Sequence, residues 1–183
     1  MAGSHRPATE GHATKLRNTP AIATNDAMSA LTVTLADEAA THALAQRLAK
    51  AAEPGDVLAL RGDLGAGKTS LARAFVRALA GDEEDVPSPT FTLVQLYDWA
   101  EGTVWHFDLY RLEKPEDALE LGVEEAFADG VSLIEWPDRL GPWLPADRLE
   151  IALRAGQDEG SRLAELTAFG RRWPQKLGEL FGD

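Results

Sequence analysis

The segment Gly62–Thr69 reads GDLGAGKT and gathers glycines, a lysine and a threonine into one short stretch. It matches G-x-x-x-x-G-K-[ST], the P-loop pattern that binds nucleotide phosphates. Its three glycines leave backbone N–H groups free to surround phosphate oxygens, and they tolerate positive φ angles. Lys68 would bring positive charge to the β- and γ-phosphates, and the Thr69 hydroxyl would ligate magnesium. The pattern predicts a site for ATP or ADP with Mg²⁺. The loop residues expected to contact nucleotide are Gly62, Leu64, Gly65, Ala66, Gly67, Lys68 and Thr69.

The segments on both sides of this loop fit the same prediction. Val57–Leu60 is continuously apolar, which is typical of a strand covered on both faces. From Lys68 to Ala80 the apolar residues recur at helical spacing, and Gly81 ends the pattern. The positive end of that helix dipole would point at the bound phosphates. We therefore expect a strand, a phosphate-binding loop and a helix in succession.

Two acidic residues are candidates for the carboxylate that a P-loop site needs near its magnesium ion. Asp108 follows the apolar run Val104–Phe107, and Glu135 follows Val131–Ile134. Spacing alone does not rank them, and either acid could simply end its strand. A division of labour is chemically reasonable: one carboxylate orders the metal, and the other polarises or positions the attacking water.

Three further features have two interpretations each, and a fourth has one. The hydroxyls of Ser88–Thr90 could bond phosphate or metal, or they could serve ordinary turn chemistry. Trp136 could stack on nucleotide or act as a packing anchor. Arg111 could pair with phosphate or form a salt bridge to a nearby acid. His106 alternates with its apolar neighbours in a predicted strand, and we expect it to be structural.

The rest of the chain predicts one α/β domain over residues 28–183, preceded by a disordered leader over residues 1–27. Met28 stands immediately before the first patterned segment and could be the true start. The fold expected is a three-layer P-loop sandwich with a mixed, largely parallel sheet flanked by helices. Helices are expected from Asp37 to Ala52 and over Ala118–Phe127. Further strands are expected at Leu31–Leu35, Thr90–Trp99, Leu149–Leu153 and Leu163–Leu166.

Composition limits the possible surroundings and partners. The chain has 183 residues, no cysteine and a net charge of -12. The absence of cysteine favours a reducing compartment, and we expect the cytoplasm. No apolar run in the sequence is long enough to span a membrane. The negative field opposes autonomous nucleic-acid binding. It favours a partner with a basic surface, although the charge could also serve solubility alone.

Beyond the P-loop, three motifs make the chain resemble the bacterial TsaE family. They are Ser88–Val94 (SPTFTLV), His106–Arg111 (HFDLYR) and Glu135–Pro137 (EWP), in matching order and spacing. The resemblance covers roughly residues 31–166. It implies an ATPase of the pathway that installs threonylcarbamoyl on adenosine in tRNA. It also implies association with the TsaB–TsaD pair, whose turnover the ATPase would sustain.

The resemblance also implies roles for single residues. Lys68 and Thr69 would bind phosphates and magnesium, Glu135 would be the metal carboxylate, and Asp108 would be essential for hydrolysis. Thr90 would belong to a switch-like loop, Trp136 would lie near the nucleotide, and residues 37–41 would lie near the base. Because no arginine is poised to complete the transition-state charge, we expect weak hydrolysis by the chain alone.

Two other functions are compatible with the same loop. A small-molecule kinase uses this cradle too, but the chain has no lid-like insertion with paired arginines. A nucleotide-gated binding module, in which hydrolysis is incidental, would need the same phosphate contacts.

Overall fold

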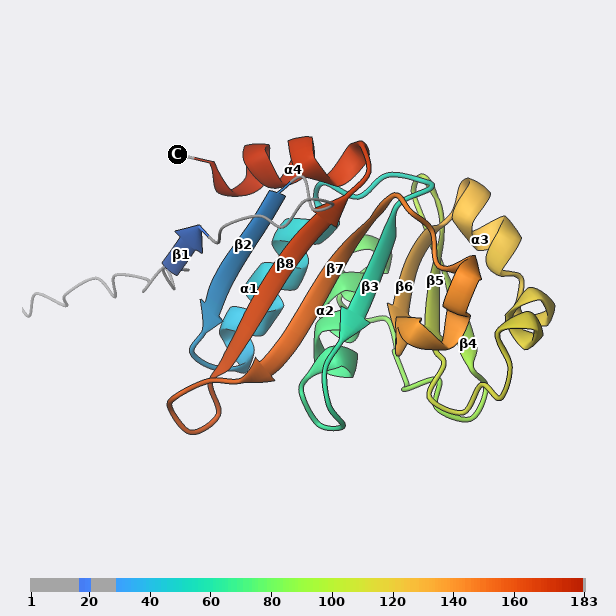
Figure 1. The fold of residues 1–183 in the computed structure, drawn as a ribbon, viewed down its shortest axis with the longest axis horizontal. Coiled ribbons are helices and arrows are strands. Elements are labelled where there is room, and N and C mark those ends of the chain that lie inside the picture. Colours follow the sequence, from blue (N-terminus) through green and yellow to red (C-terminus); the bar gives the residue numbers. More distant parts are fainter. Residues whose placement is uncertain (1–16, 21–28, 183) are drawn as a thin grey trace, which may run out of the picture.

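The computed structural model describes residues 17–20 and 29–182, and one mixed sheet runs through them (Figure 1). Its strands are β1 (Arg17–Pro20), β2 (Ser29–Leu35), β3 (Val57–Arg61), β4 (Val94–Trp99), β5 (Gly102–Asp108), β6 (Val131–Glu135), β7 (Arg148–Ala155) and β8 (Arg162–Phe169). The α-helices are α1 (Glu38–Ala49), α2 (Lys68–Ala80), α3 (Val123–Asp129) and α4 (Arg172–Phe181), and the 3₁₀ helices are η1 (Pro115–Leu121) and η2 (Pro137–Trp143).

The strand order is β1-β2-β8-β7-β3-β6-β5-β4. Strands β7, β3, β6 and β5 pair in parallel and form the centre of the sheet, whereas the outer strands pair antiparallel. Parallel neighbours end at the same edge, so the carboxyl ends of β3, β6 and β5 lie together. The predicted mixed α/β sheet with flanking helices is confirmed, and this shared edge is what positions the candidate site.

Two apolar layers cover the two faces of the sheet. Helices α1 and α2 pack behind it in Figure 1, where residues such as Leu44, Leu71 and Phe75 are fully buried. On the opposite face α3, η1 and η2 bury Phe107 and Ile134 of β5 and β6. The result is the predicted three-layer arrangement, with the central strands covered on both sides as their continuous apolar sequences require.

The predicted elements around the P-loop are confirmed closely. Strand β3 covers the predicted run, and α2 has the predicted bounds with Gly81 as its C-cap. Asp37 caps α1 as expected, because its Oδ1 accepts the Ala40 N–H at 2.8 Å. None of the described helices is long and apolar enough to cross a membrane.

Three predicted segments differ in the structure. Within the leader predicted to be disordered, residues 17–20 form β1, which pairs with the edge of β2 despite lacking strand periodicity; the other leader residues lie outside the described part of the chain. The strand predicted from Thr90 begins only at Val94, because Leu93 has φ +66° and its N–H closes a turn to the Pro89 carbonyl.

The helix predicted over Ala118–Phe127 is two short helices separated by Gly122. This glycine has φ +82°, which ends η1 and begins α3. A Cβ there would also lie 3.1 Å from the Trp105 ring. The break therefore depends on a positive φ and a close ring contact, neither of which the helical spacing of the apolar residues reveals.

A buried ion-pair cluster fastens α4 to the end of β3 opposite the P-loop. The Asp56 side chain is fully buried and accepts hydrogen bonds from the Lys176 ammonium and from the Glu53 N–H. Lys176 lowers the pKa of Glu53 through a hydrogen bond and its charge. Trp173 and Leu177 of α4 are buried beside this cluster. The helix thus depends on an internal charge pair as well as on apolar contacts.

Replacing Asp56 with alanine should lower the free energy of unfolding by about 3 kcal/mol, because Lys176 would lose its buried partner. The measurement is urea unfolding followed by circular dichroism. Glu179→Ala is the matched control, since Glu179 is an exposed acid of the same helix that bonds Gln175. Equal small losses in both variants would contradict the assigned role of Asp56.

Candidate nucleotide-binding site

The predicted phosphate loop joins β3 to α2 at the carboxyl edge of the sheet. Gly62, Gly65 and Gly67 all have positive φ angles, +139°, +78° and +104°. Gly67 is the N-cap of α2, so the free N–H groups of the first helical turn face the loop. This backbone has the shape of an anion-binding nest at the positive end of a helix.

Lys68 occupies the centre of the loop with its side chain buried. Its ammonium donates to the carbonyl oxygens of Gly62 at 2.7 Å and Asp63 at 2.8 Å. Burial lowers the pKa of Lys68, while the charges of Glu135, Asp108 and Asp63 act to raise it. The lysine is therefore held beside the place where phosphate charge would lie, and the charges of three nearby acids oppose the effect of its burial.

The two predicted carboxylates come together at the tips of neighbouring strands. Asp108 stands directly opposite Glu135 in the parallel pairing of β5 and β6. Both side chains are buried, with 5% and 2% of their residue surface exposed. The Thr69 hydroxyl lies 2.9 and 3.0 Å from the two Glu135 oxygens. Oxygen ligands of this kind suit Mg²⁺, so the Thr69–Glu135 pair fits the predicted metal site.

Asp108 makes a different set of contacts. Its Oδ2 accepts the Thr90 hydroxyl at 3.1 Å, and its Oδ1 accepts the Tyr110 N–H at 3.1 Å. The Ser88 hydroxyl lies 2.8 Å from that of Thr90 and donates to it, because the Thr90 hydrogen is already used. The Ser88–Thr90 segment thus combines turn chemistry with a direct link to the second carboxylate.

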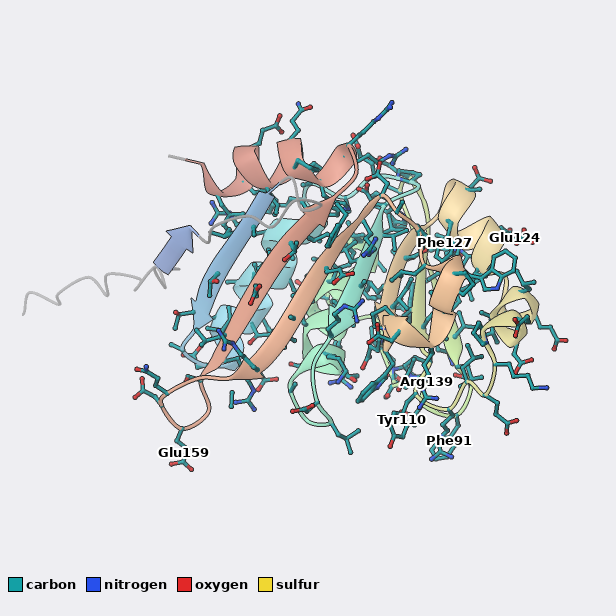
Figure 2. The ribbon with its side chains drawn as sticks, in the orientation of Figure 1. Phe91, Tyr110, Glu124, Phe127, Arg139 and Glu159 are labelled. Carbon is teal, nitrogen blue, oxygen red and sulfur yellow. The ribbon has the colours of Figure 1, made fainter. Side chains whose placement is uncertain are left out.

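These groups line one cavity of about 250 Å³ at the edge of the sheet. It is bounded by Leu64, Gly65, Gly67, Lys68, Thr69, Ser70, Ser88, Thr90, Asp108, Tyr110, Glu135 and Trp136. Two residues predicted to contact nucleotide, Gly62 and Ala66, do not line this cavity. The Gly62 carbonyl accepts a hydrogen bond from Lys68, and the Ala66 carbonyl accepts one from Arg162 at 3.2 Å. Figure 2 shows Tyr110 and Phe91 projecting from the same lower edge of the molecule.

Trp136 lies at the wall of this cavity in a strained backbone conformation. Its φ is +61°, which is uncommon for a bulky residue. Its ring centroid lies 4.2 Å from the Lys68 ammonium and 4.9 Å from the Tyr110 ring centroid. Both interpretations of this tryptophan have support, because the ring packs against the apolar layer under η2 and also borders the cavity.

A second cavity of about 220 Å³ adjoins the loop on the α1 side. It is lined by Glu38 and Thr41 of α1, by Gly67 and Ser70, and by Arg162 of β8. Glu38 and Thr41 of the segment 37–41, which is expected near the base, therefore line the same cavity as Gly67 of the P-loop. Its contact with a base stays a prediction.

Comparisons with known proteins identify the family of the chain. The family model described as "Threonylcarbamoyl adenosine biosynthesis protein TsaE" matches residues 35–164. The chain belongs to the TsaE family.

Relatives in this family cover most of the chain. A protein of Bacillus subtilis named "tRNA threonylcarbamoyladenosine biosynthesis protein TsaE" is 42% identical over 142 residues, which are 76% of this chain and 87% of that protein. The protein of the same name from Rickettsia felis is 40% identical over 132 residues, 72% of this chain and 77% of that protein. The crystal structure of Bacillus subtilis YdiB has a TM-score of 0.69 and 35% identity, covering 83% of this chain and 94% of that one.

Three residues at this TsaE-family site are not explained by sequence reasoning. His106, expected to be structural, places its Nε2 2.8 Å from Glu135 Oε1. Tyr110 borders the cavity, and Arg162 bonds the back of the P-loop from a strand almost a hundred residues away. Arg111 stacks on Phe91, 4.5 Å from its ring centroid, and in the described part of the chain no salt bridge joins it to an acid. The one sequence signal for His106 is its place two residues before Asp108 in one strand, which puts both side chains on the same face of the sheet.

Replacing Gly62 with alanine in this TsaE-family chain should both destabilise the fold and impair the loop. A Cβ at position 62 would lie 2.5 Å from the Leu153 carbonyl oxygen, and φ is +139°. We expect a loss of about 2 kcal/mol or more in unfolding free energy, measured by thermal and urea unfolding. Gly178→Ala is the control, since it sits inside α4 with open space around it and should be neutral or stabilising. A Gly62→Ala protein as stable as wild type would contradict the close approach.

Proposed function

We propose that this protein binds ATP with Mg²⁺, hydrolyses it slowly and thereby sustains the TsaB–TsaD transferase in threonylcarbamoylation of tRNA in the cytoplasm. The role in threonylcarbamoyladenosine biosynthesis comes with the family, whose relatives carry that name. One observation supports the ATPase step above all others. Lys68, Thr69, Asp108 and Glu135 come from three separate segments and converge on one cavity at the glycine loop.

The first task of the site would be to bind the triphosphate. The backbone N–H groups at the start of α2 would donate to phosphate oxygens, and the Lys68 ammonium would add charge-assisted bonds. Lys68 bonds the Gly62 and Asp63 carbonyls, and these loop oxygens would keep it in place as it turns toward phosphate. Such preorganised contacts would stabilise the negative charge of the transferring phosphoryl group.

Thr69 and Glu135 would hold the magnesium ion. When bound, this ion neutralises charge on the β- and γ-phosphates. Because the Thr69 hydroxyl lies within hydrogen-bond distance of both Glu135 oxygens, the two side chains are close enough to bind one ion together, and the hydroxyl hydrogen would then turn away from the carboxylate. The protein supplies few ligands, as is usual for Mg²⁺, and phosphate and water would supply the others.

Asp108 would position the attacking water or accept its proton. The carboxylate lines the cavity beside Glu135 but does not bond Thr69. Its bond to Thr90 links it to the Ser88–Thr90 segment, so this segment could report whether a γ-phosphate is present. Removal of a positioned general base costs about 100- to 10,000-fold in rate. Among the described residues that line the cavity there is no arginine, and we expect a partner protein to complete the transition-state charge.

The test is a multiple-turnover tRNA threonylcarbamoylation assay with purified TsaB and TsaD. We expect product beyond one equivalent of TsaD only when this chain, ATP and Mg²⁺ are all present. Equal product without the chain would refute the proposal. ADP release that depends on a small-molecule acceptor and needs no protein partner would instead support the kinase alternative.

A further inference from the structure

His106 is a buried imidazole in the polar part of the site. It lies on β5 two residues before Asp108, so both side chains project from the same face of the strand. No part of the residue is exposed, and its Nε2 lies 2.8 Å from Glu135 Oε1 on the neighbouring strand. The register of β5 and β6 produces this contact, since His106 faces Leu133 and Asp108 faces Glu135.

The chemistry of the pair fixes which nitrogen carries hydrogen. A carboxylate only accepts, so the short contact requires an Nε2–H donor. The opposite nitrogen, Nδ1, is buried and has no hydrogen-bond partner among residues 17–20 and 29–182. A buried polar atom without a partner costs free energy that an apolar residue at this position would avoid. The hydrogen bond to Glu135, and not apolar packing, therefore explains an imidazole at this position.

We propose that His106 is a positioning residue that holds the Glu135 carboxylate in the orientation that magnesium requires. This inference rests on the proposed function. His106 bonds Oε1, and Thr69 reaches both Glu135 oxygens from α2, so the acid is fixed from two sides. Mg²⁺ demands near-octahedral geometry at short distances and tolerates poorly oriented ligands badly. A donor behind the metal ligand limits its rotation and sets its basicity.

The experiment is calorimetric titration of ADP into wild type, His106→Leu and His106→Gln, each with MgCl₂ and each with EDTA. In His106→Leu the donor is absent, and we expect the gain in ADP affinity from magnesium to fall by about 10-fold or more. The affinity in EDTA should stay within about 2-fold of wild type, because the phosphate nest is untouched. His106→Gln should keep most of the magnesium gain, since its amide nitrogen reaches the position of Nε2.

Circular dichroism and thermal unfolding verify that each variant is folded. If His106→Leu does not fold, His106→Asn replaces it: its amide is polar like that of glutamine but too short to reach Glu135. The proposal is overturned if the leucine or asparagine variant keeps the full magnesium gain. It is also overturned if ADP affinity falls equally with and without metal, because that result indicates a purely structural role. A wild-type protein with no magnesium-dependent binding would refute the proposed function itself.

Discussion

Lys68→Ala should weaken the binding of a non-hydrolysable ATP analogue by about 100-fold or more and abolish support of repeated tRNA threonylcarbamoylation. Lys68 is the one basic side chain among the described residues that line the cavity at the P-loop. Its loss would leave the phosphates near the buried carboxylates of Asp108 and Glu135 without the positive charge that this side chain supplies. Calorimetry in the presence of MgCl₂ measures the binding loss, and the turnover assay with TsaB and TsaD measures the functional loss.

Two matched variants separate charge from packing and from general effects. Lys68→Met keeps an unbranched stem against the Trp136 ring but has no ammonium group, so it should lose binding as alanine does. Lys50→Ala removes an exposed lysine at the end of α1 and should bind like wild type. Near wild-type affinity in Lys68→Met would contradict the assignment of Lys68 as the phosphate-binding charge.

The core of the site was predictable from sequence because its determinants are local. The P-loop depends on eight consecutive residues, and its flanking strand and helix have unambiguous periodicity. Asp108 and Glu135 were also recognisable, because each follows an apolar run and the ends of parallel strands share an edge. The residue pattern could not rank them; the family resemblance suggested separate roles. The structure distinguishes their contacts, since Glu135 meets Thr69 and Asp108 meets Thr90.

Other features depend on tertiary contacts that sequence spacing does not contain. Alternation with apolar neighbours predicts a structural role for His106, whereas the pairing of β5 with β6 decides what its side chain contacts, a residue 29 positions away. The turn before β4 requires a positive φ at Leu93, a residue type that gives no signal for it. Strand β1 forms by pairing with an available edge, which periodicity does not encode. For His106 and β1 a partner distant in sequence determines the local structure, whereas the turn at Leu93 depends on a backbone conformation that the residue type does not indicate.

Asp108→Asn should separate hydrolysis from binding. Asparagine is nearly isosteric, and its Oδ1 can still accept the Tyr110 N–H. Affinity for the magnesium complex of an ATP analogue should therefore stay within about 3-fold of wild type. ATP hydrolysis, measured as phosphate release with TsaB and TsaD present, should fall by about 100-fold or more, because the amide cannot accept a proton from water. Glu113→Gln, which neutralises an exposed acid outside the cavity, should leave both quantities unchanged.

Comparing Asp108→Asn with Thr90→Val decides how Asp108 acts. If it acts on water directly, Thr90→Val should retain most of the hydrolysis, because the carboxylate and its bond from the Tyr110 N–H remain. If Asp108 acts through the Ser88–Thr90 segment, Thr90→Val should reproduce the loss seen in Asp108→Asn. An Asp108→Asn protein that hydrolyses ATP at the wild-type rate would exclude both roles. One that cannot hydrolyse ATP but sustains full tRNA modification would show that nucleotide binding alone drives the transferase, which is the behaviour of a nucleotide-gated binding module.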